Sequence, residues 1–311
     1  MKYALRRPLD WFSDMALSPH SSAWSIGSAF LTGALLEIST HPKPGLVTPL
    51  SNGAHRDMTL QTFMVSSAVI APCLYQCAEA GLGHSGPALG LLPQVREIGA
   101  LYEARLLAAT GGINTQRGLL FSAGVLSAAA GIAARKAPIA GAGELFAIAA
   151  AMVSGICDRE LRGTLDREPV TAGEKLFRQY GVLGIRGEAE AGFPTVATLG
   201  LPALTEARAA GATLPIALSH TLLALMSGTE DTTVLWRGGL EALEFVRNSA
   251  REIMAMGGAL TGTGLAAIHA LDARFIARNI SPGGAADLLA VTIGVDTLSG
   301  GSLPPILSSN L

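Results

Sequence analysis

An all-α fold is what this sequence predicts, and three observations support it. Alanine, leucine, methionine and glutamate dominate the long segments, and these residues favour helices. Apolar positions recur every three or four residues, the spacing of one helix face. Alternating valine, isoleucine and threonine, which would indicate strands, are rare. We therefore expect residues 1–311 to form a single compact multi-helix domain, with residues 1–20 as a peripheral N-terminal segment and glycine-rich connections forming the active site.

The helices can be placed from this periodicity, and some of their ends have a local cause. Thr171 followed by Glu174 predicts a capping box. Ser281 before Pro282 predicts an N-cap with proline at the first helical position. The segment 136–143, rich in alanine, glycine and proline, is the only candidate linker. In chain order the expected helices are 22–39, 59–80, 93–109, 116–135, 143–161, 171–180, 195–210, 215–228, 239–257, 262–278 and 282–293.

Composition excludes several classes of protein. The formal net charge is −2, so neither a basic nucleic-acid-binding face nor a polybasic membrane patch is expected. Three cysteines are too few for a disulfide framework, lack zinc-site spacing and suit a reducing compartment. Asp10 and Asp14 occupy the place where a signal peptide would be apolar. These features predict a cytoplasmic protein.

A polytopic membrane protein is the alternative on composition. The mean hydropathy is +0.41, and residues 58–78 and 209–229 lack Asp, Glu, Lys and Arg over lengths that could span a bilayer. Both runs are diluted by polar residues or proline, and aromatic residues make up only 5% of the chain. Because no aromatic belt or basic loop bias accompanies the two runs, buried helices are the preferred interpretation.

Five connections between the expected helices hold most of the unpaired polar residues beside glycines. Glycine allows backbone N–H groups and charged side chains to approach a ligand closely. If these connections meet at one end of the helical bundle, they form a polar site that accepts anions. The five connections are 41–58, 110–118, 180–196, 227–239 and 278–287.

The first two connections offer candidates for anion binding. Lys43 lies between prolines that hold it extended, which suits either phosphate binding or a stiff turn with a solvated lysine. Asp57, two residues after His55, could bind a metal or could simply favour a helix N-terminus. Asn114 and Thr115 follow two glycines at a helix start, where an anion could bind. Helix capping by either side chain is the alternative there.

The later connections supply acids. In "GIRGEAEAGFP", Glu188 and Glu190 point in different directions, so one could bind a metal or take a proton while the other pairs with Arg186. A surface turn with a local ion pair is the alternative. Asp231, between Glu230 and two threonines, offers hard oxygen ligands for Mg²⁺ or an ordinary N-cap. No standard phosphate loop and no Ser-His-Asp or Cys-His signature is present. The residues alone thus indicate a helical enzyme for an anionic, phosphorylated substrate.

Five motifs in this order resemble the triphosphoribosyl-dephospho-coenzyme A synthase family, which makes the prosthetic-group precursor for citrate lyase or malonate decarboxylase. The motifs are "HPKPGLV…GAHRDM", "ATGGINTQRGLLF", "YGVLGIRGEAEAGFPTV", "EDTTVLWRGG" and "NISPGGAADLLA", and the resemblance covers about residues 25 to 292. The chain departs from the family pattern at Gln116, where histidine is usual, and at Thr48-Pro49, where Asp-Arg is common.

The resemblance implies a transfer in which ATP loses adenine rather than phosphate. The 2′-hydroxyl of 3′-dephospho-CoA attacks C1′ of the ATP ribose with inversion, which requires a base, an acid for adenine and a carboxylate near C1′. The catalytic carboxylates expected from it are Asp57, Glu188, Glu190 and Asp231, with Mg²⁺ on Asp57, Glu188 and Asp231 and Glu190 as a further candidate. The side chains expected to bind substrate or phosphate are Lys43, His55, Asn114, Thr115, Arg117, Arg186 and Arg237.

The resemblance also implies partners, and several other functions remain as alternatives. The product would pass to a holo-acyl-carrier-protein synthase, with no nucleic acid or membrane involved, and the chain could form a homo-oligomer. A Mg²⁺-dependent N-glycosidase, or a ribosyl transferase acting on another nucleotide, would use the same acids. The membrane transporter and a non-catalytic nucleotide binder are the remaining alternatives.

Overall fold

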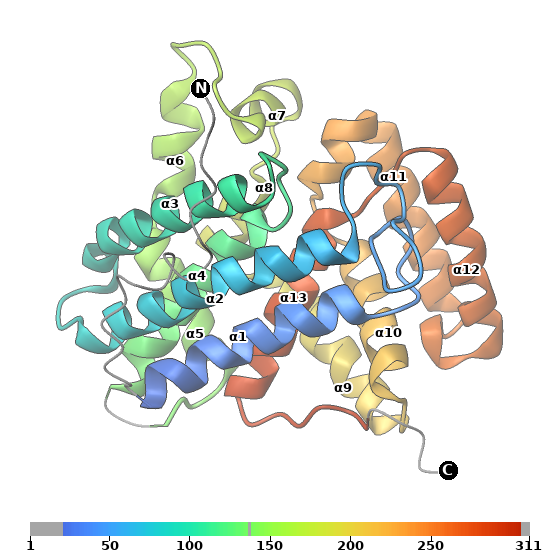
Figure 1. Cartoon of the computed structure of the whole chain (residues 1–311), viewed down its shortest axis with the longest axis horizontal. Coiled ribbons are helices and arrows are strands. Elements are labelled where there is room, and N and C mark those ends of the chain that lie inside the picture. The colour runs from blue at the N-terminus through green and yellow to red at the C-terminus, as the bar shows by residue number, and fades with distance from the viewer. Residues whose placement is uncertain (1–20, 136–137, 306–311) are drawn as a thin grey trace.

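The computed structural model describes residues 21–135 and 138–305, and it confirms the all-α prediction. These residues form helices and no strand (Figure 1). The expected segment 1–20 and part of the expected linker 136–143 lie outside the described residues. The α-helices are α1 Ser21–Ser39, α2 Leu60–Gly83, α3 Leu92–Ala109, α4 Arg117–Ala134, α5 Ala142–Val153, α6 Ile156–Glu160, α7 Ala172–Tyr180, α8 Gly184–Glu190, α9 Leu201–Ala209, α10 Leu214–Met226, α11 Thr232–Ala255, α12 Gly262–Ala277 and α13 Gly283–Leu298.

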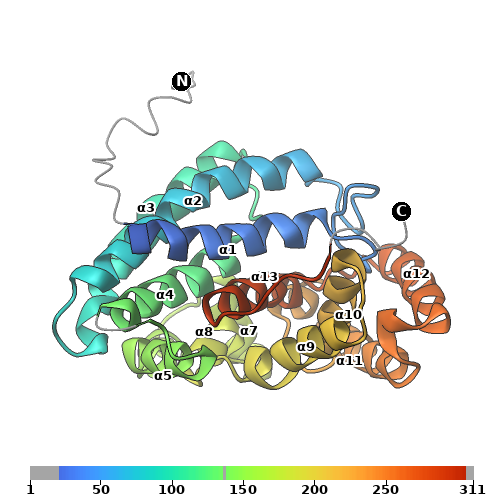
Figure 2. The same ribbon diagram turned by 90° about the horizontal axis from the view of Figure 1, so that it is seen from below.

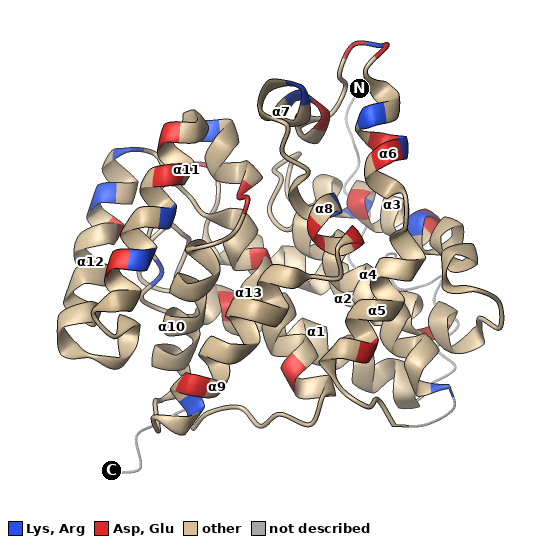
Figure 3. Cartoon of the chain, turned by 180° about the vertical axis from the view of Figure 1, so that it is seen from behind, with Lys and Arg blue, Asp and Glu red and all other residues tan. Residues whose placement is uncertain are grey.

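The helices are arranged around a few apolar ones. Helix α1 packs against α2 and α13, and α2 packs against α3 and α4. Figure 2 shows α1, α2 and α3 along one side, α4 and α13 below them, and α10 to α12 at the end opposite α3. Charged residues concentrate on α6, α7, α8, α11 and α12, whereas α4, α5 and α10 carry few (Figure 3). The α2–α4–α13 region is therefore the apolar centre of the molecule.

Close backbone contact between helices depends on small residues. A Cβ atom added to Gly81 of α2 would lie 2.1 Å from the Ala128 carbonyl oxygen of α4. A Cβ atom on Gly131 of α4 would lie 2.2 Å from the Ala78 carbonyl oxygen of α2. Two glycines facing each other across one crossing thus allow the helix backbones to touch, as in tightly packed helix pairs generally.

The apolar character of α2 and α4 reflects this packing. By length and composition alone, these two helices among the described residues could cross a membrane. In the structure they pack against each other, and 67% of the apolar window of α4 and 50% of that of α2 is buried. The run 209–229 contains α10, a helix of 13 residues, most of which are buried. The chain itself thus covers most of α4 and α10 and half of the apolar window of α2.

Four of the expectations about the helices were wrong. The segment 143–161 is broken between α5 and α6 because Gly155 has a left-handed φ of 73°. The connection 180–196 contains α8, which packs against α5 and α6. Helix α11 begins at Thr232 rather than at 239, with a kink at Gly239. Ser281 does not cap α13, because its hydroxyl contacts His55 instead. The capping box of Thr171 and Glu174 is confirmed.

Candidate active site

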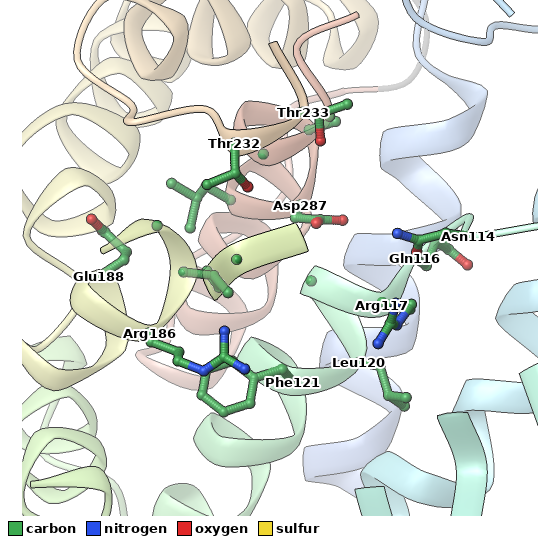
Figure 4. A pocket seen from close by; sticks show the side chains of 18 of the residues that line it. Asn114, Gln116, Arg117, Leu120, Phe121, Arg186, Glu188, Thr232, Thr233 and Asp287 are labelled. Carbon is green, nitrogen blue, oxygen red and sulfur yellow. The ribbon is translucent and has the colours of Figure 1, made fainter. Parts of the chain in front are cut away.

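A cavity of about 980 Å³ lies between the helices, and residues from all five connections line it. Figure 4 shows Gln116 and Arg117 of the second connection, Arg186 and Glu188 of the third and Asp287 of the fifth around this space. Its carboxylates are those of Glu37, Asp57, Glu103, Glu160, Glu188, Glu230 and Asp287, and its guanidinium groups are those of Arg96, Arg117, Arg186 and Arg237. Acidic groups therefore outnumber basic ones in the cavity wall.

Asp287, in the first turns of α13, is held close to the start of α4. A Cβ atom on Gly118 would lie 2.2 Å from Asp287 Oδ2, so only glycine permits this approach. Burial raises the pKa of Asp287 well above its ordinary value, and the nearby Glu37 and Asp231 raise it further. The backbone N–H of Leu119 opposes this rise by donating to the carboxylate. A carboxyl group in such surroundings tends to keep its proton.

Glu188 of α8 faces the cavity from another element. Its Oε1 accepts a hydrogen bond from the Thr195 backbone N–H (2.8 Å), and its Oε2 accepts one from the Thr195 hydroxyl (2.9 Å). Burial raises the pKa of Glu188, while these bonds and one from Val196 favour the ionised form. Figure 4 shows Glu188 and Asp287 separated within the cavity rather than in contact. The two carboxyl groups thus have different surroundings.

Glu190 and Asp231 do not line the cavity. Glu190 accepts hydrogen bonds from the backbone N–H groups of Gly155 and Cys157, at the start of α6. Asp231 is 2% exposed and caps α11 through Thr233 N (2.9 Å) and Val234 N (3.1 Å). Its other oxygen accepts from Ala285 N (2.9 Å) in α13, and burial raises its pKa. Both carboxylates bind backbone groups and hold helices beside the cavity.

The first connection meets α11 and the fifth connection at His55. The Arg237 guanidinium donates to His55 Nδ1 (3.0 Å), which leaves the proton on Nε2 to be donated to Ser281 Oγ (2.8 Å). Burial and the positive charge of Arg237 lower the pKa of His55 and favour this neutral form. Asp57 Oδ1 lies 3.6 Å from His55 Nδ1, and the Asp57 side chain is 56% exposed. Asp57 therefore keeps a carboxylate available at the cavity.

Lys43 does not line the cavity either, although it was expected to bind phosphate. It is 2% exposed and forms an ion pair with Glu37 of α1, a residue that does line the cavity. Burial lowers the pKa of Lys43, and the carboxylate of Glu37 opposes that effect. The solvated-lysine alternative is wrong, because Lys43 is buried as a counter-ion.

Three arginines of the cavity wall are paired with glutamates. Glu160 of α6 accepts from Arg186 Nε (2.7 Å) and also pairs with Arg96 of α3. Arg117 of α4 pairs with Glu103 of α3. The sequence left open an ion pair of Arg186 with Glu188 or Glu190. That prediction is wrong, because Arg186 pairs with Glu160. These guanidinium groups line the cavity and can exchange a carboxylate for a phosphate group.

The start of α4 holds uncharged polar groups. Gln116 Oε1 accepts from the hydroxyl groups of Ser66 (2.6 Å) and Ser67 (3.4 Å), while its buried Nε2 has no hydrogen-bond partner. The Thr115 hydroxyl contacts Ser66 Oγ at 2.8 Å. Asn114 also lines the cavity, and no side-chain hydrogen bond caps α4 at its N-cap residue.

The predicted metal set does not come together as a preformed site. Among the described residues, no group of three or more His, Cys, Asp or Glu side chains could hold a metal ion. Of the three predicted ligands, Asp231 is occupied by backbone N–H groups, whereas Asp57 and Glu188 line the cavity. Mg²⁺ commonly uses only one or two carboxylates together with substrate phosphates. Of the predicted ligands, only Asp57 and Glu188 therefore remain available at the cavity.

Four acids of the cavity were not expected at the site: Asp287, Glu160, Glu103 and Glu37. Asp287 ends the fifth connection, and its place three residues after two glycines at a helix start was the available signal. The other three lie on helices, where an acid usually indicates a solvated face. Only the packing of α1, α3 and α6 shows that they face inward.

Comparison with known proteins identifies the family. Residues 23–304 match the family model described as ATP:dephospho-CoA triphosphoribosyl transferase. A probable 2-(5''-triphosphoribosyl)-3'-dephosphocoenzyme-A synthase of Malonomonas rubra is 47% identical over 289 residues, 92% of each chain. The synthase of Klebsiella pneumoniae is 40% identical over 288 residues, 92% of this chain and 94% of its own. A probable synthase of Vibrio cholerae is 41% identical over 268 residues, 86% of each chain.

No solved structure matches the chain. The resemblance seen in the five motifs is nevertheless confirmed by the family model and by relatives that are similar over most of their length. The chain therefore belongs to the ATP:dephospho-CoA triphosphoribosyl transferase family and is a transferase.

Proposed function

We propose that this transferase joins the triphosphoribosyl group of ATP to the 2′-hydroxyl of 3′-dephospho-CoA and releases adenine. The bond between C1′ and the adenine nitrogen breaks, and a bond between C1′ and the acceptor oxygen forms. The hydroxyl proton goes to a base, and adenine takes a proton from an acid. The observation that carries this proposal is one cavity holding two separated carboxyl groups, Asp287 and Glu188, in different electrostatic surroundings.

Asp287 is the proposed proton donor to adenine. Its pKa is raised well above the ordinary value, so it holds a proton at a pH where most carboxyl groups have lost theirs. Glu188 is the proposed base for the attacking hydroxyl. Burial raises its pKa as well, but hydrogen bonds from Thr195 and Val196 oppose that rise and favour its charged form. Acid and base on separate elements fit an inverting displacement, which needs room between its two carboxyl groups.

The triphosphate requires cations, and the cavity has fewer of them than of acids. Arg186, Arg117 and Arg237 line the cavity and are the proposed phosphate ligands. Mg²⁺ is the proposed companion of ATP, with Asp57 as its protein ligand because that carboxylate is exposed at the cavity. The ion would neutralise phosphate charge.

The proposed place of the reaction is the cytoplasm. The product would serve as prosthetic-group precursor for the acyl carrier protein of citrate lyase or malonate decarboxylase, after transfer by a holo-acyl-carrier-protein synthase. The choice between the two pathways depends on that downstream protein.

The direct test is to incubate the purified protein with ATP and Mg²⁺, with and without dephospho-CoA, and to quantify adenine and product by chromatography. We expect adenine to appear only when the acceptor is present, in equal amount to the product. Acceptor-independent adenine would instead indicate an N-glycosidase. Tight ATP binding without turnover would indicate a nucleotide binder.

A second experiment tests the two roles. Asp287→Asn and Glu188→Gln should each lower kcat by about 10² to 10⁴. The triphosphate of 7-methyladenosine carries a base that leaves without being protonated. It should restore most of the rate of Asp287→Asn and little of that of Glu188→Gln. Equal rescue of both variants would contradict the assignment of Asp287 as the acid.

A further inference from the structure

Two helical glycines in the cavity wall are not explained by helix packing. Gly99 lies inside α3, and a Cβ atom there would meet no atom within 4 Å. Gly124 lies inside α4, and its added Cβ would meet only Cys77 Sγ, at an ordinary 3.6 Å. Gly81 and Gly131, in contrast, are required by the contact of α2 with α4. Because glycine inside a helix is destabilising relative to alanine, Gly99 and Gly124 call for another reason.

That reason is the space they leave open. Gly99 and Gly124 line the same cavity, together with Phe63 of α2, Ala100 of α3 and Phe121 of α4. We call these five residues the apolar trough. Phe63 and Phe121 are half-buried and Ala100 is exposed, so the trough opens to the cavity. No member of the trough is charged or carries a hydrogen-bonding side chain.

The two ends of the trough differ. Glu103 and Arg117, an ion pair between α3 and α4, line the cavity on one side of it. On the other side buried Cys77 and Val95 line the cavity, and Arg96, one turn before Gly99 on α3, is held by Glu160 of α6. Between Val95 and Glu103 the helix axis rises about 12 Å. The trough therefore suits a narrow, uncharged chain attached to a phosphate group at the Arg117 end.

We propose that the apolar trough binds the pantetheine arm of the acceptor, an assignment that rests on the proposed function. The arm is the only part of either substrate that is long, uncharged and joined to a diphosphate. It corresponds to about four peptide-like units, which span roughly 14 Å when extended. Its diphosphate would lie at Arg117, and its thiol would end near Cys77. ATP ends at its γ-phosphate on one side and carries only the rigid adenosine on the other, so it has no flexible chain of this length.

The test uses 4′-phosphopantetheine, which carries the arm and one phosphate but no nucleoside, so that it cannot imitate ATP. Its affinity is measured by isothermal titration calorimetry on the full chain. Wild-type protein should bind it, and Gly99→Leu should weaken binding at least about tenfold by filling the trough. The matched control is Gly143→Leu, another helical glycine with nothing within 4 Å of its added Cβ but outside the cavity wall.

A second pair keeps the test decisive if Gly99→Leu fails to fold. Ala100 and Ala104 are both exposed on α3, and only Ala100 lines the cavity. Ala100→Leu should weaken binding, whereas Ala104→Leu should not. Both trough variants should raise KM for dephospho-CoA and leave KM for ATP unchanged. Thermal melts establish that each variant is folded.

The outcomes separate this inference from the proposed function. A wild-type protein that does not bind phosphopantetheine, or trough variants that bind it normally, would overturn the inference while product formation continued. A raised KM for ATP in Gly99→Leu would overturn it too, since a purine would then fill the trough. Selective binding of phosphopantetheine without any transfer from ATP would support the trough and refute the proposed function.

Discussion

At the scale of single residues, most charged groups in or beside the cavity have a partner of opposite charge. Lys43 neutralises Glu37, and Glu160 accepts from two arginines. Asp287 differs, because its main compensation is a backbone N–H and its charged neighbours Glu37 and Asp231 are acids. A residue held in such an unfavourable state is typical of functional sites, where stability is given up for reactivity.

This placement of Asp287 predicts a pH-dependent effect on stability. Its pKa is raised on folding, so its contribution to stability is present below the ordinary carboxyl pKa and is lost as pH rises through the folded value. Asp287→Asn should therefore raise the free energy of unfolding at pH 8. The gain should shrink as pH falls toward 4. Urea unfolding at several pH values measures it.

Asp57→Asn is the matched control for that experiment, because Asp57 is an exposed aspartate on the same cavity. Its effect on the free energy of unfolding should stay within about 0.5 kcal/mol. A stabilisation by Asp287→Asn that is the same at every pH would contradict the electrostatic cause.

At the scale of elements, glycines in the same helix have opposite roles. Gly131 of α4 faces the Ala78 carbonyl oxygen of α2, so an alanine there would push the two helices apart. Gly124, two turns earlier, has room for a methyl group beside Cys77. The packing of α2 against α4 therefore depends on one glycine of α4 and tolerates substitution at the other.

We expect Gly131→Ala to lower the free energy of unfolding by about 1–3 kcal/mol through overpacking. Gly124→Ala should change it little or raise it by up to about 1 kcal/mol, because alanine favours the helix. Chemical denaturation of the two variants and wild type gives the comparison. Destabilisation of similar size at both positions would show that helix crossing is not what distinguishes them.

Element ends show where local signals suffice. The capping box of Thr171 and Glu174 was predicted because both hydrogen bonds are made within one turn. Helix α8 was missed because its glycines oppose a helix locally, and contacts with α5 and α6 support it. Ser281 was misassigned because its partner His55 is 226 positions away in sequence. Signals contained in one turn were predictable, and partners from distant segments were not.

At the scale of the whole molecule, distant segments are joined around the cavity by buried polar contacts. Asp231 connects the starts of α11 and α13, and Arg237 of α11 binds His55 of the first connection. Arg237 also donates to the Ala54 carbonyl oxygen and to Asn279 Oδ1, each at 3.1 Å. These contacts hold the first and fifth connections and the starts of α11 and α13 together beside the cavity.

The sequence by itself determined the helical class, most helix positions and the family, because helical periodicity and motif order are written along the chain. It also indicated which five connections carry the polar chemistry, and residues from all five line the cavity. Tertiary structure alone decided which charges face that cavity. Lys43, Glu190 and Asp231 are occupied by neighbours behind the wall, whereas Asp287, Glu160 and Glu37 face inward. The physical reason is that burial and charge pairing depend on elements that meet only after folding, and no local pattern encodes that meeting.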